Sequence, residues 1–320
     1  MIRSIVAAAA FVATGALAAY PEKPITFVVP FSAGGDADLA GRNLAAVAQQ
    51  YLKQPVVVVN RVGASGAIGS AAVKEAAPDG YTLLVARVGS NAVLPALQPS
   101  TPYKWNDFTF LGTLELNPFV CVVKADSPYR SLADLEKALR ANPGKLNYSS
   151  SGQGTILHLG AQLLLQAMKL PSDAALHVAY KGGNEAAVAV VSGDAHFGCG
   201  NLTSTIGLIK GGKLRALVTT TPARVADIPD VPTAREAGFP QLEAIVGWSA
   251  LFGPPNLPRE VVQKWAETLK AVSADAAWKA GNEKFGGIPH VLSPIETERF
   301  VGEQFRVYQG LAKQLGLEAK

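Results

Sequence analysis

Two stretches of the sequence follow an apolar run with glycine and small polar residues and then continue in a helical pattern. They are FVVPFSAGGDADLAG, residues 27–41, and KLNYSSSGQGTILHLG, residues 145–160. A loop between a strand and a helix exposes backbone N–H groups where the first helical turn lacks partners and the helix dipole is positive. Each stretch is therefore a candidate anion site that needs no cationic side chain. Hydrogen bonds to a charged group contribute about 1.5 to 3 kcal/mol each, so two such loops could hold a carboxylate with micromolar affinity. The alternative is that both loops are only tight turns at helix starts.

The charged residues near these loops have separable roles. Asp38 directly precedes the helical run and is interpreted as its N-cap. Asp36 lies in the loop, where it would repel a second negative charge or accept a hydrogen bond from a ligand donor. Arg87, at the carboxyl end of YTLLVARVGS, could bind a distal carboxylate through a bidentate guanidinium. The alternative for Arg87 is a structural ion pair.

Motifs that carry catalysis or bind metals are not found. The four histidines are far apart in the sequence, and neither H-E-x-x-H nor G-x-S-x-G occurs. GLIKGGKL, residues 207–214, departs from the phosphate-binding loop because Leu214 replaces the Ser or Thr that would hold magnesium. Ser151 and His158 could be imagined as nucleophile and base, but no acid partner is indicated. We therefore predict a protein that is not an enzyme and that needs neither a cofactor nor a metal.

The elements that must position the loops alternate short apolar runs with helical stretches. The first set of runs lies at 25–29, 56–59 and 81–85, and the alternation restarts after residue 128 with a second set. This pattern predicts an α/β fold with two mostly parallel sheets flanked by helices. Ligands of such sheets sit beyond the carboxyl ends of the strands, so two facing sheets would form a cleft with one polar loop on each wall.

The first nineteen residues indicate export. They contain one arginine, a short apolar centre and an A-x-A pattern ending at Ala18, which predicts a secretory signal peptide over 1–19. The apolar centre is shorter than the ~20 residues of a membrane anchor. The mature chain has 28 basic and 25 acidic residues without long basic runs, which argues against nucleic-acid binding. Cys121 and Cys199 could form a disulfide in an oxidising compartment, or could be two buried thiols.

Six segments in order resemble one known family, the Bug-type substrate-binding receptors of tripartite tricarboxylate transporters. The segments are YPEKPITFVVPFSAGGDADLAGR, NRVGASGAIGSAAVKEAAPDGYTLLV, NYSSSGQGTILHLGAQLL, HVAYKGGNEAAVAVVSGD, KLRALVTTTPARVADIPDVPTAREAGFP and GWSALFGPPNLPREVV. Together they cover essentially the whole mature chain. The resemblance is therefore much more specific than any single segment.

The resemblance implies a monomeric periplasmic clamp of the Venus-flytrap type. Residues 20–121 and 241–320 would form the first lobe, and residues 122–240 the second. A small carboxylate would bind between the lobes, and the closed form would dock on a membrane permease. The implied ligand-binding residues lie in three loops and at the start of two helices: Phe31, Ser32, Ala33, Gly34, Gly35, Asp36, Arg87, Ser90, Ser150, Ser151, Gly152, Gln153, Thr155, His158 and Asn201.

Departures from the family pattern leave the ligand open. Asp36 falls at a variable position that could tune ligand choice, and His196 and Gly200 stand where the family commonly has acids. Dicarboxylates, citrate-like acids, aromatic acids and amino acids all remain candidates. One alternative is a receptor for an amino acid or amide, in which Asp36 takes the ligand ammonium. Another is a sensor that docks on a membrane signalling protein.

Overall fold

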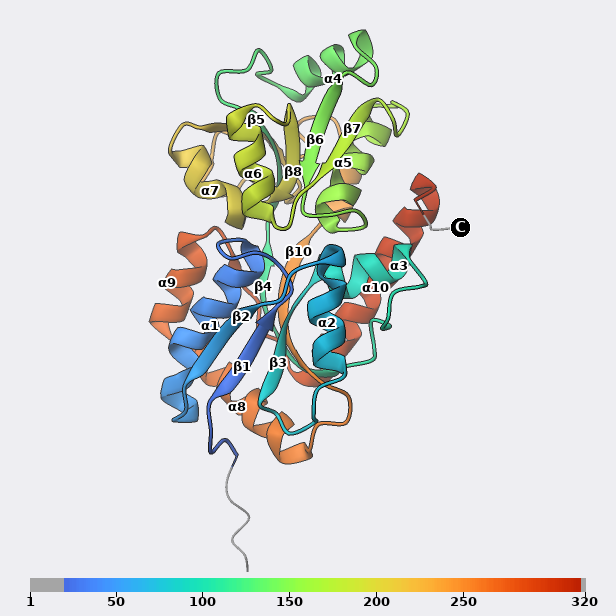
Figure 1. Ribbon diagram of the computed structural model, residues 1–320. Coiled ribbons are helices and arrows are strands. Elements are labelled where there is room, and N and C mark those ends of the chain that lie inside the picture. Colours follow the sequence, from blue (N-terminus) through green and yellow to red (C-terminus); the bar gives the residue numbers. More distant parts are fainter. Residues whose placement is uncertain (1–19, 318–320) are drawn as a thin grey trace, which may run out of the picture.

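The computed structural model describes residues 20–317 and divides them between two sheets, one in each of two stacked lobes (Figure 1). The predicted signal peptide, residues 1–19, lies outside the described residues. Within 20–317, no helix combines the length and apolar character that crossing a bilayer requires. The predicted two-lobed α/β architecture is confirmed.

The sheet of the lower lobe in Figure 1 has six strands in the order β11-β4-β10-β3-β1-β2. The strands are β1 (Ile25–Val29), β2 (Val56–Asn60), β3 (Thr82–Arg87), β4 (Thr109–Asn117), β10 (Gly247–Gly253) and β11 (Ile288–Pro289). β1 pairs in parallel with β2 and β3, whereas β10 pairs antiparallel with β3 and β4. The sheet is therefore mixed rather than mostly parallel, because β4 and β10 run between the lobes in opposite directions.

Helices cover both faces of this sheet and supply its core. They are α1 (Asp36–Leu52), α2 (Ala67–Lys74), α3 (Leu94–Leu97), α8 (Arg259–Ala274), α9 (Ala276–Lys284) and α10 (Pro294–Leu315). The apolar face of α1 is buried at Leu44, Val47, Ala48 and Leu52. Trp265 of α8 packs fully buried against Phe27 of β1. Burial of such large apolar side chains stabilises the lobe by about 25 cal/mol per Å².

The upper lobe has five strands in the order β7-β6-β8-β5-β9. They are β5 (Phe119–Lys124), β6 (Leu146–Ser150), β7 (Ala175–Ala179), β8 (Phe197–Asn201) and β9 (Leu214–Thr219). The flanking helices are α4 (Leu132–Ala141), α5 (Ile156–Ala167), α6 (Gly183–Ser192) and α7 (Leu202–Lys210). β6 is parallel to β7 and β8, and β5 is antiparallel to β8 and β9, so this sheet is mixed as well.

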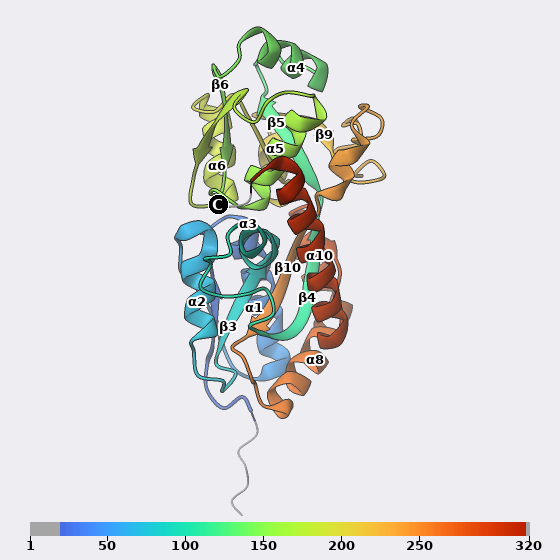
Figure 2. The same cartoon turned by 90° about the vertical axis from the view of Figure 1, so that its right-hand side faces the viewer.

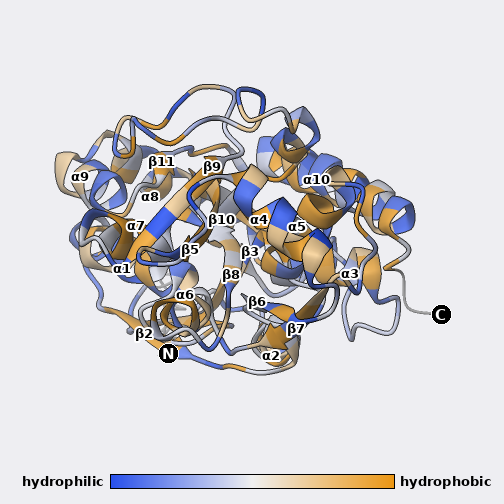
Figure 3. Cartoon of the chain, turned by 90° about the horizontal axis from the view of Figure 1, so that it is seen from above, coloured by the Kyte–Doolittle hydropathy of each residue, from blue (hydrophilic) through white to orange (hydrophobic). Residues whose placement is uncertain are grey.

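Two connections join the lobes. The chain leaves the first sheet after Asn117 and enters the second with β5 at Phe119, so the predicted boundary near residue 121 falls inside a strand of the second sheet. It returns through a short helical turn, Pro240–Ala244, into β10 at Gly247. The amphipathic helix α10 runs from the first lobe toward α5 (Figures 2 and 3). There Gln314 Nε2 donates a hydrogen bond of 3.0 Å to Gln166 Oε1.

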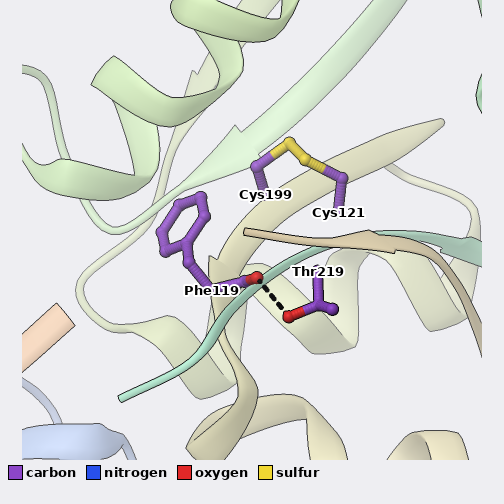
Figure 4. The surroundings of a disulfide bond; sticks show 4 residues. All are labelled: Phe119, Cys121, Cys199 and Thr219. Atoms are coloured by element: carbon purple, nitrogen blue, oxygen red, sulfur yellow. Dashed lines mark hydrogen bonds between the residues drawn. A yellow bond between two sulfur atoms is a disulfide. The ribbon is translucent and has the colours of Figure 1, made fainter. Parts of the chain in front are cut away.

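A disulfide joins Cys121 of β5 to Cys199 of β8 (Figure 4). The two residues are direct cross-strand partners in the antiparallel pair, with Cα atoms 4.0 Å apart. Pairing of the strands therefore brings together two cysteines that are 78 residues apart in the sequence. Of the two possibilities left by the sequence, the disulfide is confirmed.

Candidate functional site

Three helices begin at one small cavity between the lobes. α1 starts after Gly35, α5 after Thr155 and α6 after Gly182, and no side chain caps the first-turn amides of these helices. The first-turn residues that line the cavity are Asp36, Ala37, Ile156, Leu157 and Gly183. Backbone donors and three positive helix ends therefore converge on one point, which favours an anion.

The start of α1 differs from the sequence interpretation. The helix begins at Asp36, so Asp38 is in its first turn and is not the N-cap. The Asp38 carboxylate instead accepts hydrogen bonds from the Gly34 amide (2.9 Å), Arg42 Nε (2.8 Å) and Asn60 Nδ2 (2.9 Å). These bonds lower the pKa of the Asp38 carboxyl, although burial opposes them as the largest single influence. Asp38 thus fixes the loop, and Asp36 is left to face the cavity.

The strands at the centre of the first sheet place charges behind the cavity. Arg87 of β3 is opposite Ser249 of β10, which is opposite Glu115 of β4. The three side chains therefore meet at one level of three adjacent strands. Arg87 Nη1 donates to Ser249 Oγ and, at 2.9 Å, to Asn117 Oδ1. Glu115 accepts from Ser249 Oγ at 2.9 Å and from Asn117 Nδ2 at 3.1 Å.

Arg87 lies between two buried carboxyl groups. Its Nη2 is 3.5 Å from Asp36 Oδ2, and its Nη1 is 3.8 Å from Glu115 Oε1. Burial raises the pKa of the Glu115 carboxyl, and the charge of Arg87 only partly opposes this effect. Both possibilities considered for Arg87 are therefore compatible with its position, since it forms a structural ion pair and also lines the cavity.

Three buried polar atoms of cavity-lining residues lack a hydrogen-bond partner among residues 20–317. They are Asp36 Oδ1, Arg87 Nη2 and Asn201 Oδ1. The Asp36 and Arg87 side chains are only 8% and 4% exposed, so they have little contact with bulk solvent. The other carboxylate oxygen, Asp36 Oδ2, accepts a hydrogen bond of 2.8 Å from Asn201 Nδ2 of the second lobe. Buried polar atoms without partners are costly and are common where a ligand supplies the partner.

Hydrogen bonds between the lobes close over the cavity. Ser32 Oγ donates to Asn184 Oδ1 at 3.1 Å, and Asn184 Nδ2 donates to the Ala33 carbonyl at 2.9 Å. Between two other loops of the lobes, Ser65 Oγ donates to the Gln153 carbonyl at 2.6 Å. The cavity has a volume of about 20 Å³, which is room for about one water molecule. A larger ligand can therefore enter only if the lobes separate.

The structure sorts the sequence-predicted site residues into three groups. Those that line the cavity are Phe31, Asp36, Arg87, Ser151, Thr155 and Asn201. Those in the loops where the two lobes meet are Ser32, Ala33, Gly34, Gly35, Gly152 and Gln153. Those that lie outside the lining of the cavity are Ser90, Ser150 and His158. The ligand-binding roles of the residues in all three groups remain predictions.

The last group supports the loops. The Ser90 hydroxyl donates to Asn91 Oδ1 at 2.7 Å, and the Ser150 hydroxyl accepts from the Gly152 amide at 3.1 Å. His158 Nδ1 accepts from the Gly154 amide at 3.3 Å, and its ring stacks on His177 with centroids 4.4 Å apart. Burial, together with the nearby His177, lowers the pKa of His158 to about 4. His158 is therefore uncharged near neutral pH and holds the loop without offering a cation.

Sequence reasoning missed several residues around the cavity. Gly183 is the second glycine of the segment YKGG, and Asn184 follows it. The paired glycines at the start of a helical run were a usable signal because they match the first loop. Glu115 and Asn117 gave no such signal, since TLELN reads as an ordinary strand with alternating polar residues. Their place beside Arg87 depends on the strand order, in which β10 lies between β3 and β4.

Comparisons with known proteins agree on one type of molecule. Residues 40–317 match the family described as "Tripartite tricarboxylate transporter family receptor". BugT of Bordetella pertussis is 32% identical over 100% of this chain and 99% of its own length. Among solved structures, the periplasmic binding protein BugD is 30% identical with a TM-score of 0.88, covering 94% of this chain and 100% of its own. MatC of Rhodopseudomonas palustris, solved with bound malate, is 27% identical with a TM-score of 0.87, covering 91% of this chain and 99% of its own.

Proposed function

Because this chain belongs to the tripartite tricarboxylate transporter family of receptors, we propose that it binds a small organic carboxylate between its lobes and delivers it to a membrane permease. The family and its solved members are periplasmic solute-binding receptors and not enzymes. The ligand would therefore leave the site chemically unchanged. Export through the predicted signal peptide would place the receptor in the periplasm.

The observation that carries the proposal is the meeting of three uncapped helix N-termini at one buried cavity. Each helix end favours a negative charge by about 0.3 to 1 kcal/mol. Each hydrogen bond from an amide to a carboxylate adds about 1.5 to 3 kcal/mol. Three or four such bonds with the dipole contributions reach the roughly 8 kcal/mol of micromolar binding. The solved relative with bound malate supports the same class of ligand.

We assign the residues of the site by what they can donate. The amides of Ala37 and Leu157 would bind one carboxylate, with the hydroxyls of Ser151 and Thr155 beside it. Arg87 Nη2, which lacks a hydrogen-bond partner among the described residues, would donate to the same ligand. Water molecules that bridge amides to the carboxylate would serve almost as well as direct bonds.

Ligand entry would use the two connections between the lobes as a hinge. The connections lie between Asn117 and Phe119 and between Ile245 and Gly247, where the chain passes from one sheet to the other. Rotation there would break the contacts of Ser32 and Ser65 with the second lobe and open the cavity. The division into lobes predicted from the sequence, 20–121 with 241–320 and 122–240, belongs to this proposal, with its first boundary moved to the connection before Phe119. The closed form would be the one recognised by the permease.

Thermal stabilisation of the mature chain, residues 20–320, tests the proposal. Malate, succinate, citrate, benzoate and amino acids would be screened one by one, and a true ligand should raise the melting temperature in a concentration-dependent way. Recovery of the ligand unchanged after prolonged incubation separates a receptor from an enzyme. The proposal fails if carboxylates of every class leave the melting temperature unaltered while calorimetry also detects no binding.

A further inference from the structure

We infer that the ligand of this site carries a protonated amine beside its carboxylate, and that Asp36 binds the amine. This inference rests on the proposed function, because it assumes that the cavity between the lobes is the carboxylate site. It narrows the ligand from small carboxylates in general to amino acids and related zwitterions.

The first step is that one carboxylate oxygen of Asp36 lacks a hydrogen-bond donor. Its side chain is 8% exposed, and Oδ1 has no hydrogen-bond partner among residues 20–317. Oδ2 is already used by Asn201 Nδ2 at 2.8 Å. A buried carboxylate oxygen without a donor loses hydration and regains nothing, which is unfavourable unless a ligand brings the donor. An ammonium is the strongest such donor, because it supplies both hydrogen bonds and opposite charge.

The second step is that Arg87 does not already satisfy Asp36. Their closest atoms, Arg87 Nη2 and Asp36 Oδ2, are 3.5 Å apart, and this contact is an ion pair without a hydrogen bond. Arg87 directs Nη1 to Asn117 and Ser249 and is also 3.8 Å from Glu115. The guanidinium is therefore shared between two acids. One donor group of Arg87 and one acceptor atom each of Asp36 and Asn201 lack partners among residues 20–317, and all three residues line the same cavity. Of the two acceptors, only Asp36 carries a negative charge.

The third step is the spacing of donors and acceptor. Asp36 is the first residue of α1, and both Asp36 and Ala37 of that first turn line the cavity. Donors for a carboxylate and an acceptor for an amine are thus adjacent on one helix end. An α-amino acid has the complementary arrangement. A second ligand carboxylate in place of the amine would be repelled by Asp36.

Matched ligands that differ in one group test the inference on the unaltered mature chain. One set is aspartate, malate and succinate, which share a four-carbon dicarboxylate and differ by ammonium, hydroxyl or hydrogen. A second set is phenylalanine, 3-phenyllactate and 3-phenylpropionate, and a third is glutamine, its 2-hydroxy analogue and the unsubstituted analogue. Calorimetry should give at least about tenfold tighter binding for the amine member of whichever set binds.

The outcomes separate the two proposals. Equal or tighter binding of the amine-free member overturns the assignment of an amine to Asp36 and leaves the carboxylate receptor standing. Absence of binding in all three sets, together with a negative screen of other carboxylates, overturns the proposed function and this inference with it.

The substitution Asp36→Asn tests whether the preference for an amine arises at Asp36. Asp36→Asn keeps the shape and an acceptor for Asn201, but removes the charge that faces the amine. We expect a loss of about tenfold or more for the amine ligand and no loss for its amine-free analogue. Asp173→Asn, at an exposed aspartate of the second lobe, is the matched control and should leave both affinities unchanged. Equal losses for both ligands overturn the inference, and if Asp36→Asn does not fold, the ligand sets on the unaltered chain decide it alone.

Discussion

Ser65 of the first lobe donates a hydrogen bond of 2.6 Å from its hydroxyl to the main-chain carbonyl of Gln153 in the second lobe. A Cβ atom at Gly152 would lie only 2.6 Å from the same hydroxyl, so the two loops approach each other without room for a side chain. Each loop has a positive φ at the point of contact, 55° at Ser65 and 128° at Gly152. This contact joins the first lobe to the second, as do the contacts of Ser32 and Ala33 with Asn184.

Removal of the Ser65 hydroxyl should weaken ligand binding without unfolding the protein. Ser65→Ala deletes one hydrogen bond made only when the lobes are closed, which stabilises that form by about 0.5 to 1 kcal/mol. The apparent affinity should therefore fall about two- to fivefold, because the binding-competent form is less populated. Calorimetry with the best ligand from the screen measures the change. Ser273→Ala removes a hydroxyl bonded within α8 and should leave affinity intact, and an unchanged affinity for Ser65→Ala would show that this contact does not influence closure.

A branched side chain at Gly35 should block closure. The Cβ of an alanine would meet Asn184 Oδ1 and the Ser32 carbonyl at an ordinary 3.4 Å, but the additional methyl groups of a valine would enter the space occupied by the second lobe. We expect Gly35→Val to abolish ligand-induced thermal stabilisation and Gly35→Ala to retain most of it. The circular dichroism spectra should be the same for both variants. Full ligand response in Gly35→Val would mean that this loop does not approach the ligand.

The sequence was sufficient for the elements but not for the centre of the site. Strand–loop–helix patterns predicted the loops after β1 and β6, because glycine and hydroxyl residues at the end of an apolar run have few other uses. Capping was misjudged at Asp38, since an aspartate in the first turn reaches back to the loop amide as well as an N-cap would. Glu115, Asn117 and Ser249 could not be placed, because their contact with Arg87 arises from non-local strand order. The same holds for the disulfide, which required the register of β5 with β8.

The disulfide should contribute substantially to the stability of the second lobe. A crosslink between Cys121 and Cys199 restricts a long loop of the unfolded chain, an effect typically of about 2 to 5 kcal/mol. Cys121→Ala with Cys199→Ala should lower the free energy of unfolding by this amount in urea titrations. A thiol assay of the wild-type chain in denaturant should find no free thiol before reduction and two after it. Detection of free thiols before reduction would contradict the bond.

Acid should destabilise the protein through the buried His158. Its folded pKa of about 4 is below the ordinary value of 6.5, so the unfolded chain takes up the proton first as the pH falls. The stabilisation is complete above pH 6.5 and is lost as the pH falls through the folded pKa, by up to about 3 kcal/mol. His158→Asn keeps an acceptor for the Gly154 amide and removes the titrating group. Unfolding free energies between pH 7 and 4 should fall less steeply for this variant, and parallel curves would exclude His158 as a source of the acid sensitivity.

The ion pair between Arg87 and Asp36 should be strongly coupled, because both side chains are more than nine-tenths buried. Arg87→Met leaves the Asp36 carboxylate without its cation and should lower the free energy of unfolding by about 3 to 5 kcal/mol. Asp36→Asn removes the carboxylate charge that Arg87→Met would leave without a cation. The double variant should therefore lose about 1 to 3 kcal/mol less free energy of unfolding than the two single variants lose together. Urea unfolding of the four forms measures this coupling. The exposed pair Lys23 and Asp79, 3.7 Å apart, is the control and should show coupling near zero. Additive losses at Arg87 and Asp36 would mean that the two charges are stabilised separately by their neighbours, with Asn201 and Asn117 supplying what the ion pair does not.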